Sequence, residues 1–112
     1  MANRDSNSDL LPGTLHMMIL RTLQQEPLHG YGIAKRIRDW SGGDLEIEDG
    51  SLYPALTRMV LKGWLLAKPA VSENNRKIKL YELTPEGRSR LEQESDSFQK
   101  MIRAIQLVMR AS

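Results

Sequence analysis

Four breaks in the sequence restrict the folds that this chain can adopt. Pro27 ends a helix, and Pro85 suits the first position of a new one. Gly42, Gly43 and Gly63 are typical of helix C-termini. The segments between these breaks are short, and the whole chain of 112 residues has the size of one compact domain. The short segments must therefore pack against one another around a single core.

The segments before Gly63 have the periodicity of helices. Residues 10–26 carry apolar side chains at helical spacing and predict the first helix. A second helix follows the turn at residues 28–30 and ends before Gly42. A third follows Asp49, which is expected to cap it, and ends near residue 62. The positions expected to be buried are Leu15, Met18, Ile19 and Leu23 in the first helix, Ile33, Ile37 and Trp40 in the second, and Leu52, Leu56, Met59 and Val60 in the third.

Other segments have the pattern of β structure. Residues 44–48 alternate polar and apolar side chains and predict a short strand. Residues 64–68 and 78–83 predict the two strands of a hairpin, because the turn-forming residues 69–77 separate them. Apolar side chains occur on both faces of the second strand, so we expect both faces to be partly buried.

The start of the last helix completes the order of elements. Thr84 offers a capping hydroxyl, and Pro85 follows it at the first helical position. The predicted order is helix, helix, short strand, helix, strand, loop, strand and long helix. This order is that of a winged helix-turn-helix followed by one extra helix, a mainly α fold with a small β wing (α+β).

The third predicted helix has side chains suited to reading DNA. In a helix-turn-helix the second helix crosses the phosphate backbone, where Lys35 is a candidate contact, and the third lies in the major groove. Ser51 can hydrogen-bond to any base, and Arg58 can reach a guanine edge or a phosphate. Tyr53, on the flank, offers a hydroxyl and a ring. The positions expected to be exposed are Ser51, Pro54, Ala55, Arg58 and Lys62.

These residues also have purely structural explanations. Ser51 can simply cap the helix, and Arg58 can be a solvated surface residue. Pro54 offers DNA a rigid apolar surface, but it falls in the first turn if the helix starts one or two residues late. The surrounding charge favours DNA, because one acid, Glu73, stands among the bases of residues 58–79. These bases are Arg58, Lys62, Lys68, Arg76, Lys77 and Lys79.

Acidic residues supply the main argument for another function. Asp44, Glu46, Glu48 and Asp49 precede the third helix, where they suit its dipole but would repel phosphate. For DNA binding, their segment must point partly away from the duplex. The formal net charge of the chain is only +2. Both observations keep open a winged-helix protein-interaction module that has lost DNA binding.

The last helix has the pattern of a dimerisation helix. Its apolar residues recur at alternating spacings of three and four, with Ser95 completing the register, as in a coiled coil. A second copy of the helix is the expected partner, and the alternative is packing against the first helix of the same chain. We thus expect a flexible tail at 1–9, a DNA-binding domain at 10–84 and a dimerisation helix at 85–112. The interface residues are Leu91, Phe98, Ile102, Ile105 and Met109.

Motifs for catalysis or cofactors do not stand out. The lone G-x-G of Gly30 and Gly32 follows a helix, and Lys35 stands where a third glycine would be needed, which argues against a dinucleotide site. No residue spacing around His16 or His29 suits a metal or a nucleophile. The chain has no cysteine, no signal-peptide pattern and no apolar stretch of membrane-spanning length. We therefore expect a cytoplasmic protein that is not an enzyme and needs no cofactor.

Four short motifs resemble the PadR family of transcriptional regulators, in particular its compact subgroup with a single C-terminal helix. The resemblance implies a homodimer held by that helix, repression of a nearby promoter, and release from double-stranded DNA by an effector. In compact members a small hydrophobic ligand can bind between the subunits, but Phe98 is the only aromatic residue of this seam. The motifs are Gly13-Thr14-Leu15, His29-Gly30-Tyr31-Gly32-Ile33, Gly50-Ser51-Leu52-Tyr53-Pro54-Ala55-Leu56 and Tyr81-Glu82-Leu83-Thr84-Pro85-Glu86-Gly87.

The same resemblance implies roles for individual residues. Tyr31, Ser51, Tyr53 and Pro54 are implied DNA contacts. So are the bases of the wing, which here are Arg76, Lys77 and Lys79. One departure from the family pattern is Leu80, which stands where members often have an aromatic residue.

Overall fold

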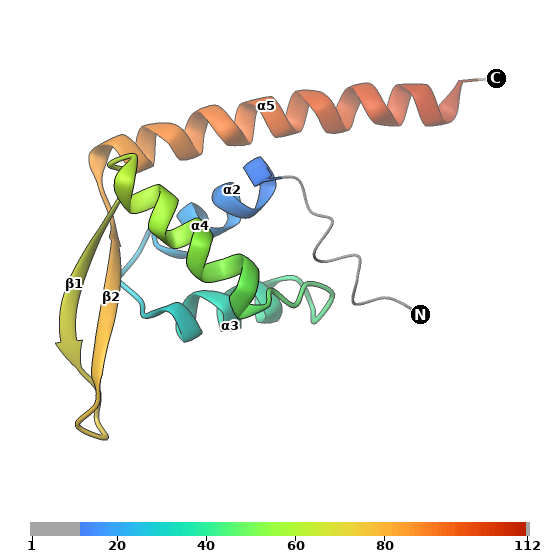
Figure 1. The fold of residues 1–112 in the computed structure, drawn as a ribbon. Helices are drawn as coiled ribbons and strands as arrows, with labels where there is room; N and C mark the ends of the chain where they lie inside the picture. Colours follow the sequence, from blue (N-terminus) through green and yellow to red (C-terminus); the bar gives the residue numbers. More distant parts are fainter. Residues whose placement is uncertain (1–11, 112) are drawn as a thin grey trace.

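The computed structural model describes residues 12–111, so the expected tail at 1–9 and the predicted first residues of the first helix lie outside the described part. Helices α2, α3 and α4 pack together beside a two-stranded sheet, and α5 crosses above them (Figure 1). The elements are α2 (Pro12–Thr22), α3 (Gly30–Trp40), α4 (Asp49–Leu61), β1 (Leu65–Val71), β2 (Lys77–Leu83) and α5 (Pro85–Arg110).

One core holds the three short helices and the wing base together. Ile19 and Leu20 of α2 are fully buried, as are Leu52 and Leu56 of α4. Between α2 and α3, Arg36 donates a hydrogen bond to the Thr22 carbonyl oxygen at 3.1 Å and pairs with Glu26. The buried apolar core consists of Leu15, Ile19, Leu20, Leu23, Ile33, Ile37, Leu52, Ala55, Leu56, Met59, Leu65, Tyr81, Leu83 and Leu91.

The prediction that Trp40 is buried was wrong. Its side chain is 54% exposed at the end of α3. The guanidinium carbons of Arg21 and Arg36 lie 5.3 and 5.5 Å from the centre of its ring. The tryptophan therefore interacts with two cations at the surface, where the π face of an indole attracts positive charge.

The predicted strand at 44–48 was also wrong, because these residues form a loop. Leu45 and Ile47 are half-buried against the core, which explains the alternating pattern without a strand partner. The Leu45 amide donates to the Ser41 hydroxyl at 3.0 Å.

The predicted cap of the third helix was wrong as well. Asp49 is the first residue of α4 and does not cap it. Glu48 holds the cap position without a side-chain hydrogen bond.

The wing is longer than predicted. β1 continues through Pro69 to Val71, and the turn occupies only residues 72–76. Pro69 is tolerated because the sheet has two strands and one side of β1 therefore needs no amide donor. Asn75 has a φ of 63°, a conformation that asparagine adopts more readily than most residues.

The start of α5 is fixed as predicted. The Thr84 hydroxyl accepts a hydrogen bond from the Gly87 amide at 2.9 Å, and Pro85 occupies the first turn. A Cβ atom at position 87 would collide with the Trp64 carbonyl oxygen, so glycine permits the close approach of α5 to the wing base. Leu91 is buried, while the second half of the helix extends past α2 (Figure 1).

Candidate nucleic-acid interface

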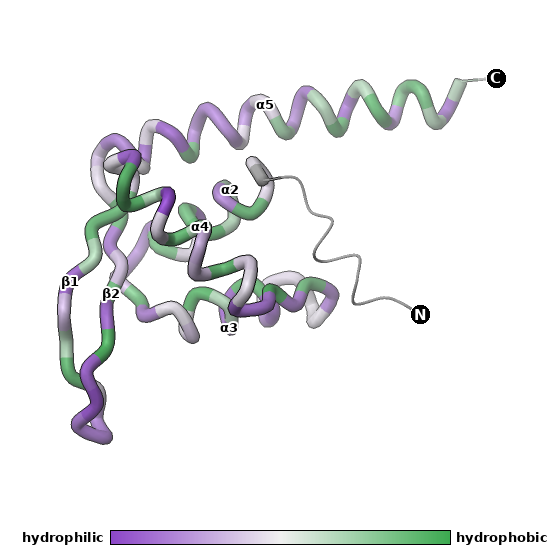
Figure 2. Tube along the Cα trace, in the orientation of Figure 1, coloured by the Kyte–Doolittle hydropathy of each residue, from purple (hydrophilic) through white to green (hydrophobic). Residues whose placement is uncertain are grey.

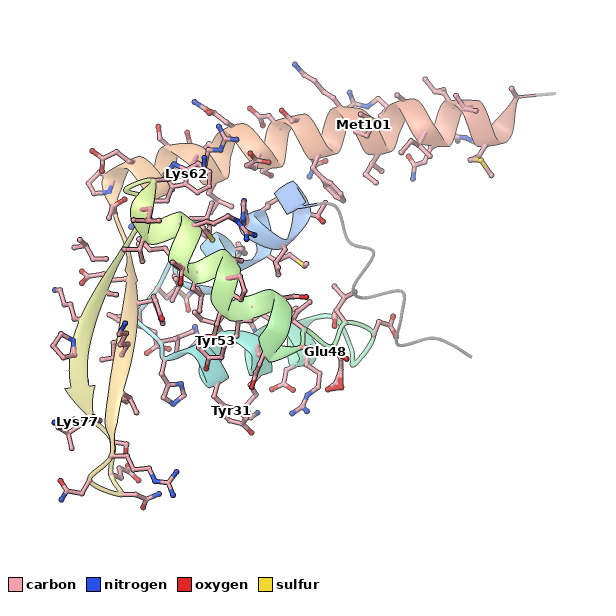
Figure 3. The ribbon with its side chains drawn as sticks, viewed as in Figure 1. Tyr31, Glu48, Tyr53, Lys62, Lys77 and Met101 are labelled. Atoms are coloured by element: carbon pink, nitrogen blue, oxygen red, sulfur yellow. The ribbon has the colours of Figure 1, made fainter. Side chains whose placement is uncertain are left out.

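The N-terminal turn of α3 presents a histidine cap and an exposed tyrosine. The Nδ1 atom of His29 accepts a hydrogen bond from the Gly32 amide at 2.9 Å. The Tyr31 side chain is 67% exposed and lies on the side of the molecule away from α5 (Figure 3). One turn later, Lys35 pairs with Asp39 at 2.8 Å, and this hydrogen bond lowers the pKa of the Asp39 carboxyl. Tyr31 and Lys35 thus form one exposed ridge.

Close contact at Gly30 joins α3 to α4. A Cβ atom at position 30 would lie 2.5 Å from the hydroxyl oxygen and 2.8 Å from the ring of Tyr53. The Tyr53 ring therefore rests directly on the α3 backbone, although 43% of its side chain is exposed. Burial raises the pKa of Tyr81 in the wing, and Tyr53 shifts it in the same direction, so the two phenols are neighbours. Tyr53 thus lies where α3, α4 and β2 meet.

The outward face of α4 differs from the prediction at two positions. Ala55 was expected to be exposed but is fully buried, because it shares the core face with Leu52 and Leu56. Pro54 and Thr57 are exposed and lie three residues apart on the outward face. Thr57 was missed, although its position three residues after Pro54 and its distance around the helix from the predicted buried stripe could have identified it.

Among the other expected residues of α4, Ser51, Arg58 and Lys62 lie toward the edges of this face. Ser51 is half-buried, and Tyr53, Pro54 and Arg58 are exposed. Lys62, just past the end of α4, has its Nζ atom 5.5 Å from the centre of the Trp64 ring. These positions leave Pro54, Thr57 and the exposed edge of Tyr53 at the centre of the outward face.

Lysines of the wing lie on two different faces. Side chains alternate along β2, so Lys77 and Lys79 share a face with the buried Tyr81 and Leu83. That face is turned toward the helices, and its two lysines lie beyond the core, near the tip. Lys68 lies on the opposite face, where it pairs with Glu82 at 2.8 Å. The basic cluster seen in the sequence is therefore divided between the two faces.

A backbone bridge fixes the wing next to α3. The Leu28 amide donates to the Tyr81 carbonyl oxygen at 3.1 Å, and the Tyr81 amide donates to the Leu28 oxygen at 2.8 Å. Tyr31, Tyr53 and Lys77 consequently lie on the side of the molecule remote from α5 (Figure 3). We call this side of the molecule the lower face. It is defined by Tyr31, Tyr53 and Lys77, and we assign to it the exposed residues Pro54, Thr57 and Lys79 of the same helix and strand.

The acidic segment borders the start of α4. Glu48 lies at the end of α4 that is remote from the wing tip and Lys77 (Figure 3). Glu46 pairs with Arg38 at 3.5 Å, which offsets part of the negative charge. Arg76, by contrast, is exposed in the turn of the wing, where its amide donates to the Ser72 hydroxyl at 3.1 Å. Charge on the lower face thus changes from basic at the wing to acidic beyond α4.

A second cluster of polar side chains lies between α2, α4 and α5. The Nε2 atom of His16 is buried without a hydrogen-bond partner, and its ring packs edge-on against Trp64 at 5.7 Å. Burial lowers the pKa of His16, the positive charge of Arg58 lowers it further, and Glu94 raises it. Lys62 and Arg90 add smaller downward effects. His16 is thus partly buried between elements.

The exposed half of α5 carries an apolar stripe. Phe98, Ile102, Ile105 and Met109 are between 36% and 77% exposed in the single chain. Figure 2 shows hydrophobic segments recurring along this part of the helix. Leu91, which was predicted to lie in the same interface, is buried against its own chain. The first turns of α5 therefore pack within the chain, as the alternative interpretation expected, and only the later turns leave their stripe uncovered.

A metal site is not evident in the part of the chain that the structure describes. Residues 12–111 contain no group of three His, Asp or Glu side chains placed to hold a metal ion. A shallow groove of about 470 Å³ beside Trp64 is lined by Pro85, Ser89, Arg90 and other residues of early α5. Within the same range, no helix has the length and apolarity needed to span a membrane.

Comparison with known proteins agrees with this arrangement. The profile of the "Transcriptional regulator PadR-like family" matches residues 19–93. The chain belongs to this family. The members of this family and the solved neighbours are transcriptional regulators and not enzymes, as the sequence predicted. Solved regulator structures confirm the winged-helix α+β fold.

Two solved structures and one curated protein illustrate the similarity of this PadR-like chain to others. A transcriptional regulator from Clostridium thermocellum is 26% identical, with a TM-score of 0.80 over 88% of this chain and 95% of that chain. A PadR family regulator from Eggerthella lenta has a TM-score of 0.81 over 97% of this chain and 93% of its own, but at 24% identity this likeness concerns the fold alone.

The curated relative is a much longer protein. An uncharacterized 37.1 kDa protein in transposon TN4556 of Streptomyces fradiae is 40% identical over 85 residues. The match covers 76% of this chain and 23% of that protein, so this PadR-like chain spans less than a quarter of the relative's length.

Proposed function

We propose that this PadR-like protein is a homodimeric repressor that acts in the cytoplasm on a near-palindromic operator. The observation that carries the proposal is the composition of the lower face, where exposed residues of α3, α4 and the wing lie together. In this arrangement α4 enters the major groove, with Tyr53, Pro54 and Thr57 toward the bases. Ser51 and Arg58 contact DNA from the edges of the helix.

The remaining contacts in the proposal go to phosphates. Tyr31 and Lys35 of α3 lie where the second helix of a helix-turn-helix crosses the backbone. Lys77 and Lys79 extend from the wing on the face turned toward the helices, and Arg76 extends from its turn. Such contacts give affinity without sequence preference, whereas those of α4 give the preference.

Dimerisation is proposed through the uncovered stripe of α5. Phe98, Ile102, Ile105 and Met109 remain between 36% and 77% exposed, and a second copy of the helix supplies matching apolar residues. Leu91 contributes only by holding α5 onto its own domain. For two α4 helices to enter successive turns of the major groove, the twofold axis must place them about 34 Å apart, which is one turn of DNA.

Fluorescence anisotropy with labelled duplexes tests the proposal. One duplex carries the DNA directly upstream of the protein's own gene, and the control carries the same bases in shuffled order. We expect tighter binding to the upstream duplex and affinities that fall steeply as salt rises. Ser51→Ala and Tyr53→Phe should reduce the difference between the duplexes. If the protein binds neither duplex at low salt, a protein-interaction module would explain the winged helix better than a DNA-binding repressor.

A further inference from the structure

His29 is an uncommon choice for the cap of a helix. Its Nδ1 atom accepts a hydrogen bond from the Gly32 amide, and its carbonyl oxygen accepts from the Ile33 amide at 3.1 Å. Asn, Asp, Ser and Thr are the residues that usually supply such a cap. An imidazole differs from these side chains because it carries a second nitrogen on its far side. Capping alone therefore does not explain why a histidine stands here.

The cap fixes the proton of the neutral ring. A ring nitrogen that accepts a hydrogen bond carries no hydrogen, so the single proton of neutral His29 lies on Nε2. Among residues 12–111, this Nε2–H group donates to no protein acceptor. The α3 cap thus holds the imidazole in one orientation and one tautomer, with a hydrogen-bond donor left over.

The position of His29 indicates what that donor meets. Leu28, just before it, bridges to Tyr81 of the wing, and Gly30, just after it, supports Tyr53 of α4. The centre of the exposed Tyr31 ring lies 6.1 Å from the centre of the imidazole ring. His29 is therefore at the junction of the three elements that form the lower face. The start of α3 is also where a helix-turn-helix protein approaches a phosphate.

We propose that the Nε2–H group of His29 donates a hydrogen bond to a phosphate oxygen of DNA. This inference rests on the proposed DNA-binding function and adds a residue to it. The role is one of positioning, because a neutral donor fixes the start of α3 on the backbone without reading a base. The capping bond to Gly32 aligns the ring for the contact before DNA arrives, which reduces the entropy that binding must remove.

Three substitutions separate the cap from the phosphate contact. His29→Asn keeps an acceptor at the position of Nδ1 but has no group in place of Nε2–H. His29→Asp also keeps the cap and adds a negative charge that repels phosphate. His29→Ala removes both functions. We expect thermal stability to be kept in the Asn and Asp variants and reduced in the Ala variant.

DNA affinity should follow a different order. Against a fluorescein-labelled random-sequence duplex, the Asn variant should bind about tenfold more weakly than the unchanged protein, and the Asp variant more weakly still. The loss should be similar for the upstream duplex, because phosphates are common to both. The slope of affinity against salt should stay the same in the Asn variant, since a neutral donor releases no counterion.

A long-range ¹H–¹⁵N NMR spectrum of the free protein tests the tautomer without DNA. We expect Nε2 to be protonated and Nδ1 to be unprotonated. Protonated Nδ1, or an Asn variant that binds both duplexes as well as the unchanged protein, would overturn the proposal while leaving DNA binding intact. If the unchanged protein binds neither duplex at low salt, the proposed function fails, and the His29 contact fails with it.

Discussion

Gly30 is the residue that sets the distance between α3 and α4, because any larger side chain would meet the Tyr53 ring. We predict that Gly30→Ala lowers the free energy of unfolding by about 1–3 kcal/mol, the usual cost of an added group in a packed site. The substitution should also weaken DNA binding, since Tyr53 must move on the lower face. Urea denaturation followed by circular dichroism measures the first effect, and anisotropy measures the second.

Gly50 provides the matched control for this substitution. A Cβ atom at position 50, also in the first turn of a helix, would have no heavy atom within 4 Å. Gly50→Ala should therefore leave stability unchanged or raise it by about 0.5 kcal/mol through the unfolded state. Equal stabilities of the two alanine variants would show that the contact between Gly30 and Tyr53 is not as close as the structure places it.

His16 gives the protein a dependence of stability on pH. Its pKa in the folded chain is lowered from 6.5, mainly by burial and then by Arg58, so the folded state favours the neutral ring. The unfolded chain binds the proton more readily, and stability is therefore present above 6.5 and lost as the pH falls through the folded pKa. We predict that His16→Gln, which stays neutral, shows a smaller loss of melting temperature between neutral and mildly acidic buffer.

The His16 test is a comparison of slopes, because every other titratable group is common to both proteins. Thermal melts of the two proteins across the same series of buffers isolate the contribution of His16. Parallel curves would mean that His16 is protonated equally well in the folded and unfolded chains, contrary to its buried position.

Individual residues were predicted well where periodicity alone decides burial. The apolar stripe of α4 gave Leu52, Leu56 and Met59 correctly, and the start of α5 followed from Thr84. The prediction that Ala55 is exposed was wrong, because a small residue fits either face of a helix. Its burial depends on its angle around the helix relative to Leu52 and Leu56. The contact between Gly30 and Tyr53 lay beyond prediction, since it depends on how closely two helices approach in space.

At the scale of elements, the two faces of the wing should differ in their contribution to DNA binding. We predict that the double variant Lys77→Gln/Lys79→Gln lowers the slope of log affinity against log salt by roughly two, because each phosphate contact contributes about 0.9. Binding should weaken similarly for the upstream and shuffled duplexes. Anisotropy titrations over a range of salt concentrations measure both quantities.

Lys68→Gln is the control for the wing, because Lys68 lies on the opposite face and pairs with Glu82. Its removal should leave the salt slope unchanged and cost little stability, as is usual for exposed ion pairs. If Lys68→Gln lowers the slope as much as the loss of one inner lysine, both faces of the wing approach DNA and the proposed orientation is incorrect.

Elements were easier to predict in kind than in extent. The four helices and the hairpin were expected from periodicity and turn residues. The loop at 44–48 imitated a strand because it buries alternate side chains on the core without a neighbouring strand to pair with. Pro69 was predicted to end the first strand, but β1 passes through it because one side of β1 is unpaired in the two-stranded sheet. The sequence does not show which side of a strand lacks a neighbour.

At the scale of the whole molecule, the sequence predicted only in part which turns of α5 pack against the same chain and which stay exposed. The seam of apolar residues marked one continuous face, but the sequence did not show where the chain's own core stops covering it. In the structure Leu91 is buried and Phe98 is exposed, so the change occurs within two turns of helix. The uncovered half then predicts assembly, because an isolated apolar stripe in water favours a partner.

Dimerisation through this stripe is tested by placing a charge on each side of α5. We predict that Ile102→Glu yields a monomer at micromolar concentration, because the carboxylate would be buried between two helices without a partner. Leu107 lies about 140° further around the helix and is also exposed, so Leu107→Glu should remain dimeric.

Sedimentation equilibrium gives the mass of each variant, and anisotropy with the upstream duplex gives its affinity. The Ile102 variant should bind DNA at least tenfold more weakly than the Leu107 variant, since one subunit reaches only half of a palindromic site. A dimeric Ile102 variant, or a monomeric Leu107 variant, would place the interface on another face of α5. Melting curves check that the two glutamates leave the winged domain folded, which is expected because both residues lie beyond the buried core.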